Sequence, residues 1–323
     1  MPVTAKIPTE KWTGKVREIT IGATEADGGT RTRTVTVGGA TSLPYLHFEG
    51  EFPHPPAIAI EIQNGYPSDW SPVLLKVWGE ETLNDSAVWA KKAEEAGADI
   101  IALTLRGENA DGSQTTPEQV KETVEKVLKS TGLPLIILGP GQAELDNELL
   151  VAAAEAASGE RVALGMCEDK NYRTIAAAAL AHKQMVVASS PIDVNIAKQV
   201  NILLTDMAIT PDRILMDPTT GALGYGIEYT YSVMERLRLA ALRGDSMTQQ
   251  PMFCLAGQES WRQKESKVAQ DVPQEWGDLE KRGITWEVLT ATTLLHAGAD
   301  ILSLRHPESV KQVRAAIDKL MAH

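Results

Sequence analysis

Short apolar runs alternate with longer helical stretches along most of the chain. The runs are rich in Val, Ile and Leu, whereas the stretches between them carry Ala, Glu and Lys with a helical period. This alternation is typical of a parallel sheet covered on both faces, because both faces of each strand are then buried. The runs predict eight strands, at 57–62, 99–105, 134–140, 161–167, 185–191, 213–218, 252–257 and 300–304.

Each run is followed by one predicted helix. The helices are expected at 85–97, 116–132, 143–159, 171–183, 193–206, 227–244, 286–298 and 306–322. Eight successive units fit a (β/α)8 TIM barrel, which takes roughly 250 residues. An open doubly wound sheet is the alternative. The even number of units and the closing helix favour the barrel, and the segment AGADIIALTLR recurs as AGADILSLR, as expected of repeated βα units.

The first 56 residues follow a different pattern. Segments 16–23, 32–39 and 43–50 alternate apolar and polar positions and are separated by glycine turns. Such a pattern indicates a β-hairpin or a small antiparallel cap. The sequence therefore predicts two parts, an N-terminal β-hairpin extension over 1–56 and a (β/α)8 barrel over 57–323.

The charge balance narrows the class of partner. The 323 residues carry a formal net charge of -12. An acidic surface argues against nucleic acid or an anionic membrane as the main partner, since both favour positive charge. No apolar run approaches the roughly 20 residues that span a bilayer, and the N-terminus lacks the apolar core of a secretory signal. We therefore expect a cytoplasmic protein with no membrane segment.

The cysteines and histidines argue against metal chemistry on this chain. A four-iron cluster is normally held by about four thiolates, whereas this sequence has only Cys167 and Cys254. No histidine pair has the spacing of a metal site. Cys167 has only Lys170 nearby to lower its thiol pKa, so we interpret it as a passive, buried thiol, and Cys254 as a core residue. We expect no iron–sulfur cluster and no metal ligands here.

Polar residues at the carboxyl ends of the predicted strands are the candidates for chemistry, because barrel enzymes have their active sites there. These residues include no nucleophile paired with a base, and we predict no catalytic residue. Glu61 lies inside the first barrel strand. We expect it to be paired with a lysine or arginine from a neighbouring strand, as buried acids usually are.

The stretch DPTTGALGYG (217–226) stands out at one of these strand ends. Its glycines have the order G-x-x-G-x-G, and no Walker lysine follows, so dinucleotide and P-loop interpretations fail. Glycines let a backbone approach a ligand closely, and free N–H groups before a helix can bind amides or carboxylates. Hydroxyls of Thr219, Thr220 and Tyr225 add donors. A plain glycine-rich turn is the alternative to ligand or partner contact.

The same stretch carries a family resemblance. DPTTGALGYGIEYTYSVMERLRLAAL (217–242), ASSPIDVNIAKQ (188–199) and AIAIEIQN (57–64) resemble the small (delta) subunit of the corrinoid iron–sulfur protein of the acetyl-CoA decarbonylase/synthase system. The similarity runs along the whole chain. It implies a (β/α)8 barrel in a heterodimer with a large subunit, which holds the four-iron cluster and most of the cobalamin site.

The resemblance also implies a role in methyl transfer. In the family, the barrel mouth covers the upper, methyl-carrying face of the corrin. The heterodimer accepts a methyl group from methyltetrahydrofolate through a separate methyltransferase and passes it to acetyl-CoA synthase. Both enzymes are then transient partners. We infer that the corrin amides are contacted by Thr219, Thr220, Gly221, Gly224, Tyr225, Gly226, Ser190 and Gln258.

Two other functions remain open from the residues. A stand-alone, pterin-dependent methyltransferase barrel could hold a pterin ring with Asn64, Asp217, or Asp193 together with Asn195. A phosphate-handling barrel such as an aldolase ranks last. Its glycine-rich loops commonly follow the seventh and eighth strands, whereas here the glycines follow the sixth, and no strand-end lysine offers a Schiff base.

Overall fold

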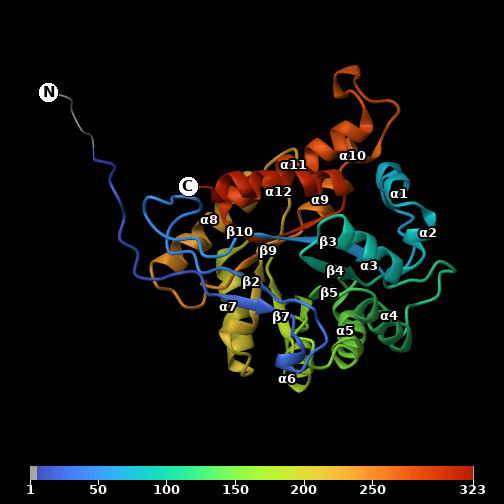
Figure 1. Cartoon of the computed structure of the whole chain (residues 1–323), viewed down its shortest axis with the longest axis horizontal. Coiled ribbons are helices and arrows are strands. Elements are labelled where there is room, and N and C mark those ends of the chain that lie inside the picture. Colours follow the sequence, from blue (N-terminus) through green and yellow to red (C-terminus); the bar gives the residue numbers. More distant parts are fainter. Residues whose placement is uncertain (1–5, 323) are drawn as a thin grey trace.

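Eight parallel strands close into a barrel in the computed structural model, which describes residues 6–322 (Figure 1). The last strand pairs with the first, so the predicted TIM barrel is confirmed and the open sheet is excluded. All eight strands lie within three residues of the predicted runs at both ends. The strands are β3 (Ala57–Gln63), β4 (Ile100–Thr104), β5 (Leu135–Leu138), β6 (Ala163–Cys167), β7 (Met185–Ser189), β8 (Ile214–Asp217), β9 (Met252–Cys254) and β10 (Ala299–Leu304).

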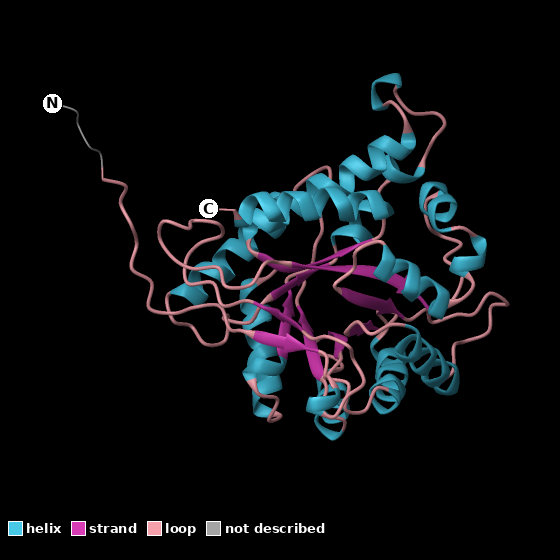
Figure 2. Ribbon diagram, viewed as in Figure 1, coloured by secondary structure: helices cyan, strands magenta, loops and turns pink. Residues whose placement is uncertain are grey.

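One major helix follows each strand and covers the outside of the barrel (Figure 2). Local sequence sets where these helices start: Thr116 and Gln119 form a capping box, and Asp85 and Asp193 each accept two backbone N–H groups of a first turn. The helices are α3 (Ser86–Glu95), α4 (Pro117–Ser130), α5 (Ala143–Ala156), α6 (Tyr172–Ala181), α7 (Val194–Asp206), α8 (Glu228–Leu242), α11 (Leu279–Ala297) and α12 (Pro307–Met321).

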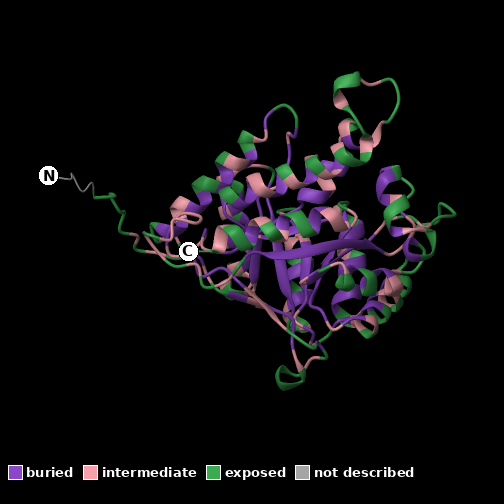
Figure 3. Cartoon of the chain, turned by 45° about the horizontal axis from the view of Figure 1, so that its top comes forward, coloured by how far each residue is buried: buried purple, intermediate pink, exposed green. Residues whose placement is uncertain are grey.

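Side chains of each strand alternate between the barrel interior and the helix layer. Most residues of the barrel strands are buried, as Figure 3 shows by colour. In β3, Ile58 and Ile60 pack under the helices, whereas Ala57 and Ala59 belong to the inner cluster. Successive residues of a strand point to opposite faces. Glu61 therefore follows Ala59 into the barrel interior, near its carboxyl-terminal end.

The N-terminal segment closes the opposite end of the barrel. Strands β1 (Ile19–Ile21) and β2 (Val35–Val37) pair antiparallel, which confirms the predicted hairpin. Their apolar side chains join the inner cluster of the barrel. The third predicted segment, 43–50, forms consecutive turns instead of a strand, because Pro44 lacks an N–H group and Tyr45 is left-handed. The boundary between residues 56 and 57 stays a prediction.

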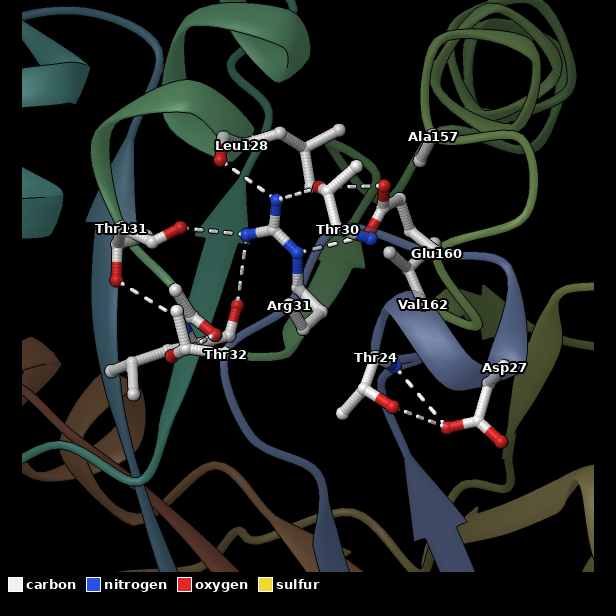
Figure 4. Close-up of polar contacts among 12 residues, drawn as sticks. Thr24, Asp27, Thr30, Arg31, Thr32, Leu128, Thr131, Ala157, Glu160 and Val162 are labelled. Atoms are coloured by element: carbon white, nitrogen blue, oxygen red, sulfur yellow. Dashed lines mark hydrogen bonds and ion pairs between the residues drawn. The ribbon is translucent and has the colours of Figure 1, made fainter.

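A single buried arginine ties the hairpin loop to the barrel (Figure 4). Arg31 is 3 % exposed, and its Nε donates to the Glu160 carboxylate at 2.9 Å. Its other nitrogens donate to backbone carbonyls at the end of α4 and just before β5, those of Leu128, Thr131 and Leu133. The guanidinium thus satisfies carbonyls that the helix end leaves without partners.

Additional short helices surround the open end. They are α1 (Pro72–Trp78), α2 (Glu80–Leu83), α9 (Ala256–Arg262) and α10 (Lys264–Lys267). The 3-10 turn at Gln274–Trp276 follows α10, whereas those at Glu25–Asp27 and Pro211–Arg213 lie in the hairpin and just before β8. The predicted strand 252–257 is thus too long, because the chain leaves the sheet after Cys254 and enters α9. Figure 1 shows α10 and the following loop projecting beyond the barrel. None of the helices within residues 6–322 is long and apolar enough to cross a membrane.

Candidate functional site

The open end of the barrel brings together most of the residues that the sequence singled out. Six of them lie on the loop between β8 and α8, which we call the mouth loop (residues 218–227). Ser190 directly follows the neighbouring strand, and its backbone N–H donates to the Asp217 carbonyl at 3.0 Å. Gln258 lies in the first turn of α9 instead of a strand-end loop, and it is partly exposed. Their contacts with a ligand stay predictions.

Asp217 organises the start of the mouth loop. Its side chain is 1 % exposed and accepts hydrogen bonds from the Thr219 N–H at 2.9 Å and the Ser189 hydroxyl at 3.0 Å. Burial raises the pKa of this carboxyl from 3.8 to about 7; the two hydrogen bonds oppose the shift and the negative charge of Glu168 adds to it. Asp217 therefore fixes the start of the mouth loop relative to the end of β7.

The rest of the mouth loop is held by Thr230 and by unusual backbone conformations. The Thr230 hydroxyl accepts from the Gly221 N–H at 3.1 Å and lies 3.2 Å from the Thr219 carbonyl. Thr219 and Ala222 adopt left-handed backbone angles with φ of 62° and 58°. Such conformations cost free energy in residues that carry a Cβ, and they cluster at binding sites.

Two glycines of the loop meet distinct requirements. Gly224 is left-handed with φ of +86°, where side chains are strained. A Cβ on Gly226 would come within 2.7 Å of the Tyr229 ring, so this glycine allows the ring to pack against the backbone. Tyr225 and Tyr229 are 83 % and 63 % exposed. Two exposed tyrosines beside a strained loop form a surface suited to contact with another molecule.

Two buried hydroxyls at the mouth have no partner among residues 6–322. Ser190 is 2 % exposed and Thr220 is 3 % exposed, and neither side-chain oxygen makes a hydrogen bond. Buried polar groups are nearly always satisfied. Both residues were predicted to touch a ligand, and a ligand that accepts or donates hydrogen bonds would satisfy them.

Glu61 has the partner type that the sequence predicted. Arg305, at the end of β10, donates to both Glu61 carboxylate oxygens at 2.7 Å. The guanidinium also lies over the Trp70 ring, 4.4 Å from its centroid. Glu287 of α11 holds Arg305 in place by accepting its backbone N–H at 2.6 Å. Burial raises the pKa of Glu287, and its hydrogen bonds oppose that shift.

This cluster extends along the mouth through Gln63 and Arg106, which are polar residues at predicted strand ends, and through Asp69, which sequence reasoning missed. Gln63 donates to Glu61 at 3.3 Å and accepts from Arg106 at 2.9 Å, and Arg106 also binds Asp69 at 2.9 Å. Glu61 and Gln63 are two residues apart in β3, so the alternation of side chains predicts that both lie on the same face of the strand. The charged groups neutralise one another, which leaves no free base or nucleophile in this cluster.

The residues suggested for a pterin ring are used by the fold. Asn64 accepts the Arg106 backbone N–H at 2.6 Å. Asp193 caps α7 by accepting from two backbone N–H groups, at 2.7 and 3.0 Å. Asp217 is bound as described above. All three have internal partners that a pterin would have to replace.

The two thiols are inert. Cys167 and Cys254 are both buried and free, on strands that are not neighbours. Burial raises the Cys167 pKa to about 12 and raises that of Cys254 well above its ordinary value. Both cysteines are buried, as the sequence predicted. Across the part of the chain that the structure describes, no group of three or more His, Cys, Asp and Glu side chains could hold a metal ion.

Solved structures with the same architecture include dihydropteroate synthases. The enzyme from Xanthomonas albilineans superposes with a TM-score of 0.55 at 15% identity, covering 84% of this chain and 93% of that one. The enzyme from Coxiella burnetii gives 0.56 at 13% identity, covering 86% and 96%. At such low identity the likeness shows the barrel fold alone.

Sequence relatives are much closer. The chain is 37% identical to acetyl-CoA decarbonylase/synthase complex subunit delta of Archaeoglobus fulgidus, over 96% of this chain and 70% of that protein. It is 38% identical to subunit delta 1 of Methanosarcina thermophila, over 93% and 69%. Residues 18–313 match the family model of the CO dehydrogenase/acetyl-CoA synthase delta subunit. The chain therefore belongs to the delta-subunit family of the acetyl-CoA decarbonylase/synthase complex.

Proposed function

We propose that the chain is the small subunit of a heterodimeric corrinoid iron–sulfur methyl carrier. In this proposal, the open end of the barrel covers the upper face of a cobalamin that a large partner subunit mainly holds. Membership of the delta-subunit family supports this role. The absence of a reactive thiol among residues 6–322 also suits a covering subunit better than a catalyst.

The observation that carries the proposal is the pair of unsatisfied hydroxyls beside the mouth loop. The edge of a corrin is rich in amide groups, which accept and donate hydrogen bonds. Ser190 and Thr220 are buried donors without partners, so their chemistry fits such an edge. The backbone at Gly221 and Gly224 adds a surface with little side chain, and Tyr225 and Gln258 complete the proposed contacts.

Each part of the mouth then has a physical task. A corrinoid, when bound, supplies the cobalt that accepts and gives up the methyl group. The mouth loop binds the edge of the corrin and keeps water from its upper face. Asp217 fixes the shape of that loop through Thr219 and Ser189. Glu61 is paired with Arg305, so its carboxylate is not free to compete as a nucleophile for the methyl group.

The partners follow from the same proposal. The large subunit holds the four-iron cluster and anchors the corrin. A methyltetrahydrofolate methyltransferase and acetyl-CoA synthase bind transiently, and the location is the cytoplasm. Because donor and acceptor both need the covered face, the barrel and the large subunit must move relative to each other in each cycle.

A glycine substitution with a matched control tests the role of the mouth loop. Gly224→Val places a β-branched residue at φ of +86°, with only ordinary contacts to Trp286 at 3.6 Å. Gly28→Val does the same at φ of +84° near the closed end, with nothing within 4 Å. Each should cost about 1–2 kcal/mol of stability. Only Gly224→Val should lower cobalamin retention and methyl transfer in the reconstituted complex.

Two results would contradict the proposal. Normal cobalamin retention and methyl transfer in a folded Gly224→Val complex would show that the mouth loop does not contact the corrin. Tight binding of methyltetrahydrofolate to the isolated chain, measured by calorimetry, would favour the pterin-dependent methyltransferase instead. Weak or absent binding is expected, because Asn64, Asp193 and Asp217 already have internal partners.

A further inference from the structure

A polar cavity lies at the closed end of the barrel, away from the mouth. It has a volume of about 450 Å³, which falls in the roughly 300–1,000 Å³ range of small-molecule sites. Cations stand just before three successive strands, Arg161 before β6, Lys183 before β7 and Arg213 before β8. The other lining residues are Glu18, Thr20, Met185 and Asp212.

Two of the three cations are not anchored by a hydrogen bond, although the pKa of the Asp27 carboxyl is lowered by hydrogen bonds from Thr24 and also by the nearby charge of Arg161. The side chains of Arg161 and Lys183 make no hydrogen bond or ion pair with any other residue in the described range 6–322. Arg213 is anchored, because its guanidinium donates to the backbone carbonyls of Ala179 and Gln184. The cavity wall therefore holds two unanchored cations beside an anchored one.

Three cations face two acids, Glu18 and Asp212, on the cavity wall. Glu18 is bound to His54 at 3.2 Å and Lys15 at 3.6 Å. Asp212 is exposed and lies on the same 3-10 turn as Arg213. Burial lowers the pKa of Arg213, the Asp212 carboxylate opposes that shift, and the charge of Arg161 adds to it. The Arg161 and Arg213 charges are thus close enough to repel each other.

The backbone gives no reason for long side chains at these positions. Arg161 and Lys183 are left-handed, with φ of 51° and 59°. The corresponding junctions after α3 and α11 use glycine, Gly97 and Gly298, at φ of 97° and 102°. A residue with a Cβ is less stable than glycine in this conformation. The chain thus accepts strain at both cationic junctions, as it also does at Ala208 after α7, at φ of 67°.

We propose that this cavity binds a phosphate group, either as inorganic phosphate or on a phosphorylated small molecule. Arginine matches phosphate oxygens with two parallel hydrogen bonds, and lysine adds a point charge. Cations that converge from three successive strand starts suit one compact anion better than an extended acidic peptide. The site lies at the end of the barrel opposite to the mouth and does not depend on corrinoid binding.

A double substitution separates binding from folding. Arg161→Asn/Lys183→Asn removes the two unanchored cations, and asparagine tolerates the left-handed backbone. The melting temperature without phosphate should therefore stay the same or rise. Lys170→Asn is the control, because it removes an exposed lysine at the mouth. Calorimetry on the full chain would use inorganic phosphate, pyrophosphate and ADP at constant ionic strength.

We expect saturable binding to the wild-type chain and to Lys170→Asn, and affinity weaker by about tenfold or more in the double variant. Tighter binding of ADP than of phosphate would identify a phosphate ester as the ligand, and equal binding would identify the free anion. Three results would overturn the proposal: no saturable binding of any probe, wild-type affinity in the double variant, or an equal loss in Lys170→Asn. Should the double variant not fold, the exposed Lys183→Asn alone replaces it.

Discussion

Protonation of Asp217 should make the stability of this protein depend on pH in a defined way. The pKa of Asp217 rises from 3.8 to about 7 on folding. The folded state therefore binds more protons than the unfolded state between these values, and the free energy of unfolding falls as pH rises. Asp217→Asn removes the titrating group. An amide can still accept the Thr219 N–H and can donate to Ser189, so the fold should persist.

The magnitude follows from the size of the pKa shift. One pKa unit corresponds to about 1.4 kcal/mol, so full ionisation of Asp217 costs about 4 kcal/mol. Between about pH 5 and pH 8 the free energy of unfolding of the wild type should fall by about 2.5 kcal/mol relative to Asp217→Asn. Below about pH 3 the difference should no longer change, because Asp217 is then protonated in both states.

Urea unfolding of both proteins at several pH values would measure this difference, and contributions from all other groups cancel to first order. Asp169→Asn, at an exposed position of the same end of the barrel, controls for the loss of one negative charge. A wild-type minus Asp217→Asn difference that is flat between about pH 5 and pH 8 would refute the reasoning, since it would mean that burial does not raise the Asp217 pKa.

Two further substitutions test the contacts that shape the two ends of the barrel. Arg31→Met leaves Glu160 buried without its charged partner and should lower the free energy of unfolding by about 3–5 kcal/mol. Arg33→Met removes the hydrogen bond from an exposed arginine to the Ala98 carbonyl and should lower it by no more than about 1.5 kcal/mol. Equal losses in urea unfolding would contradict the role given to Arg31. Gly257→Ala puts a Cβ 2.7 Å from Glu287 Oε1 and 2.9 Å from the Arg305 backbone nitrogen. It should destabilise by about 1–3 kcal/mol although alanine favours helices, and a stabilised variant would contradict the close packing.

The hydrophobic pattern was sufficient to predict the barrel because every strand is buried on both faces. Runs such as 134–140 are continuous in apolar residues, and the helices between them have their own period. The short helices α1 and α2 were missed, since seven and four residues are too few to show a period. They owe their stability to packing, for example of Trp78 and Leu83 in the core.

The candidate site was only partly predictable. The sequence predicted a positive partner for Glu61, but not Arg305, which lies 244 residues away and becomes a neighbour only when the barrel closes. It marked Ser190 and Thr220, but it could not show that their hydroxyls lack partners. Burial and orientation arise from long-range packing, and a single sequence contains no direct signal for either. Sequence reasoning also missed Arg161 and Lys183, because only the packing of neighbouring strands brings them to one cavity.

Cobalt analysis of the purified protein tests the central claim most directly. The chain would be purified from its native source under mild conditions and also expressed alone, and cobalt would be measured together with the visible spectrum. We predict that the native complex contains a large, cysteine-rich subunit and stoichiometric cobalt, and that the chain alone is colourless and free of cobalt. Stoichiometric cobalt on the isolated chain, or a native protein without such a partner, would contradict the account.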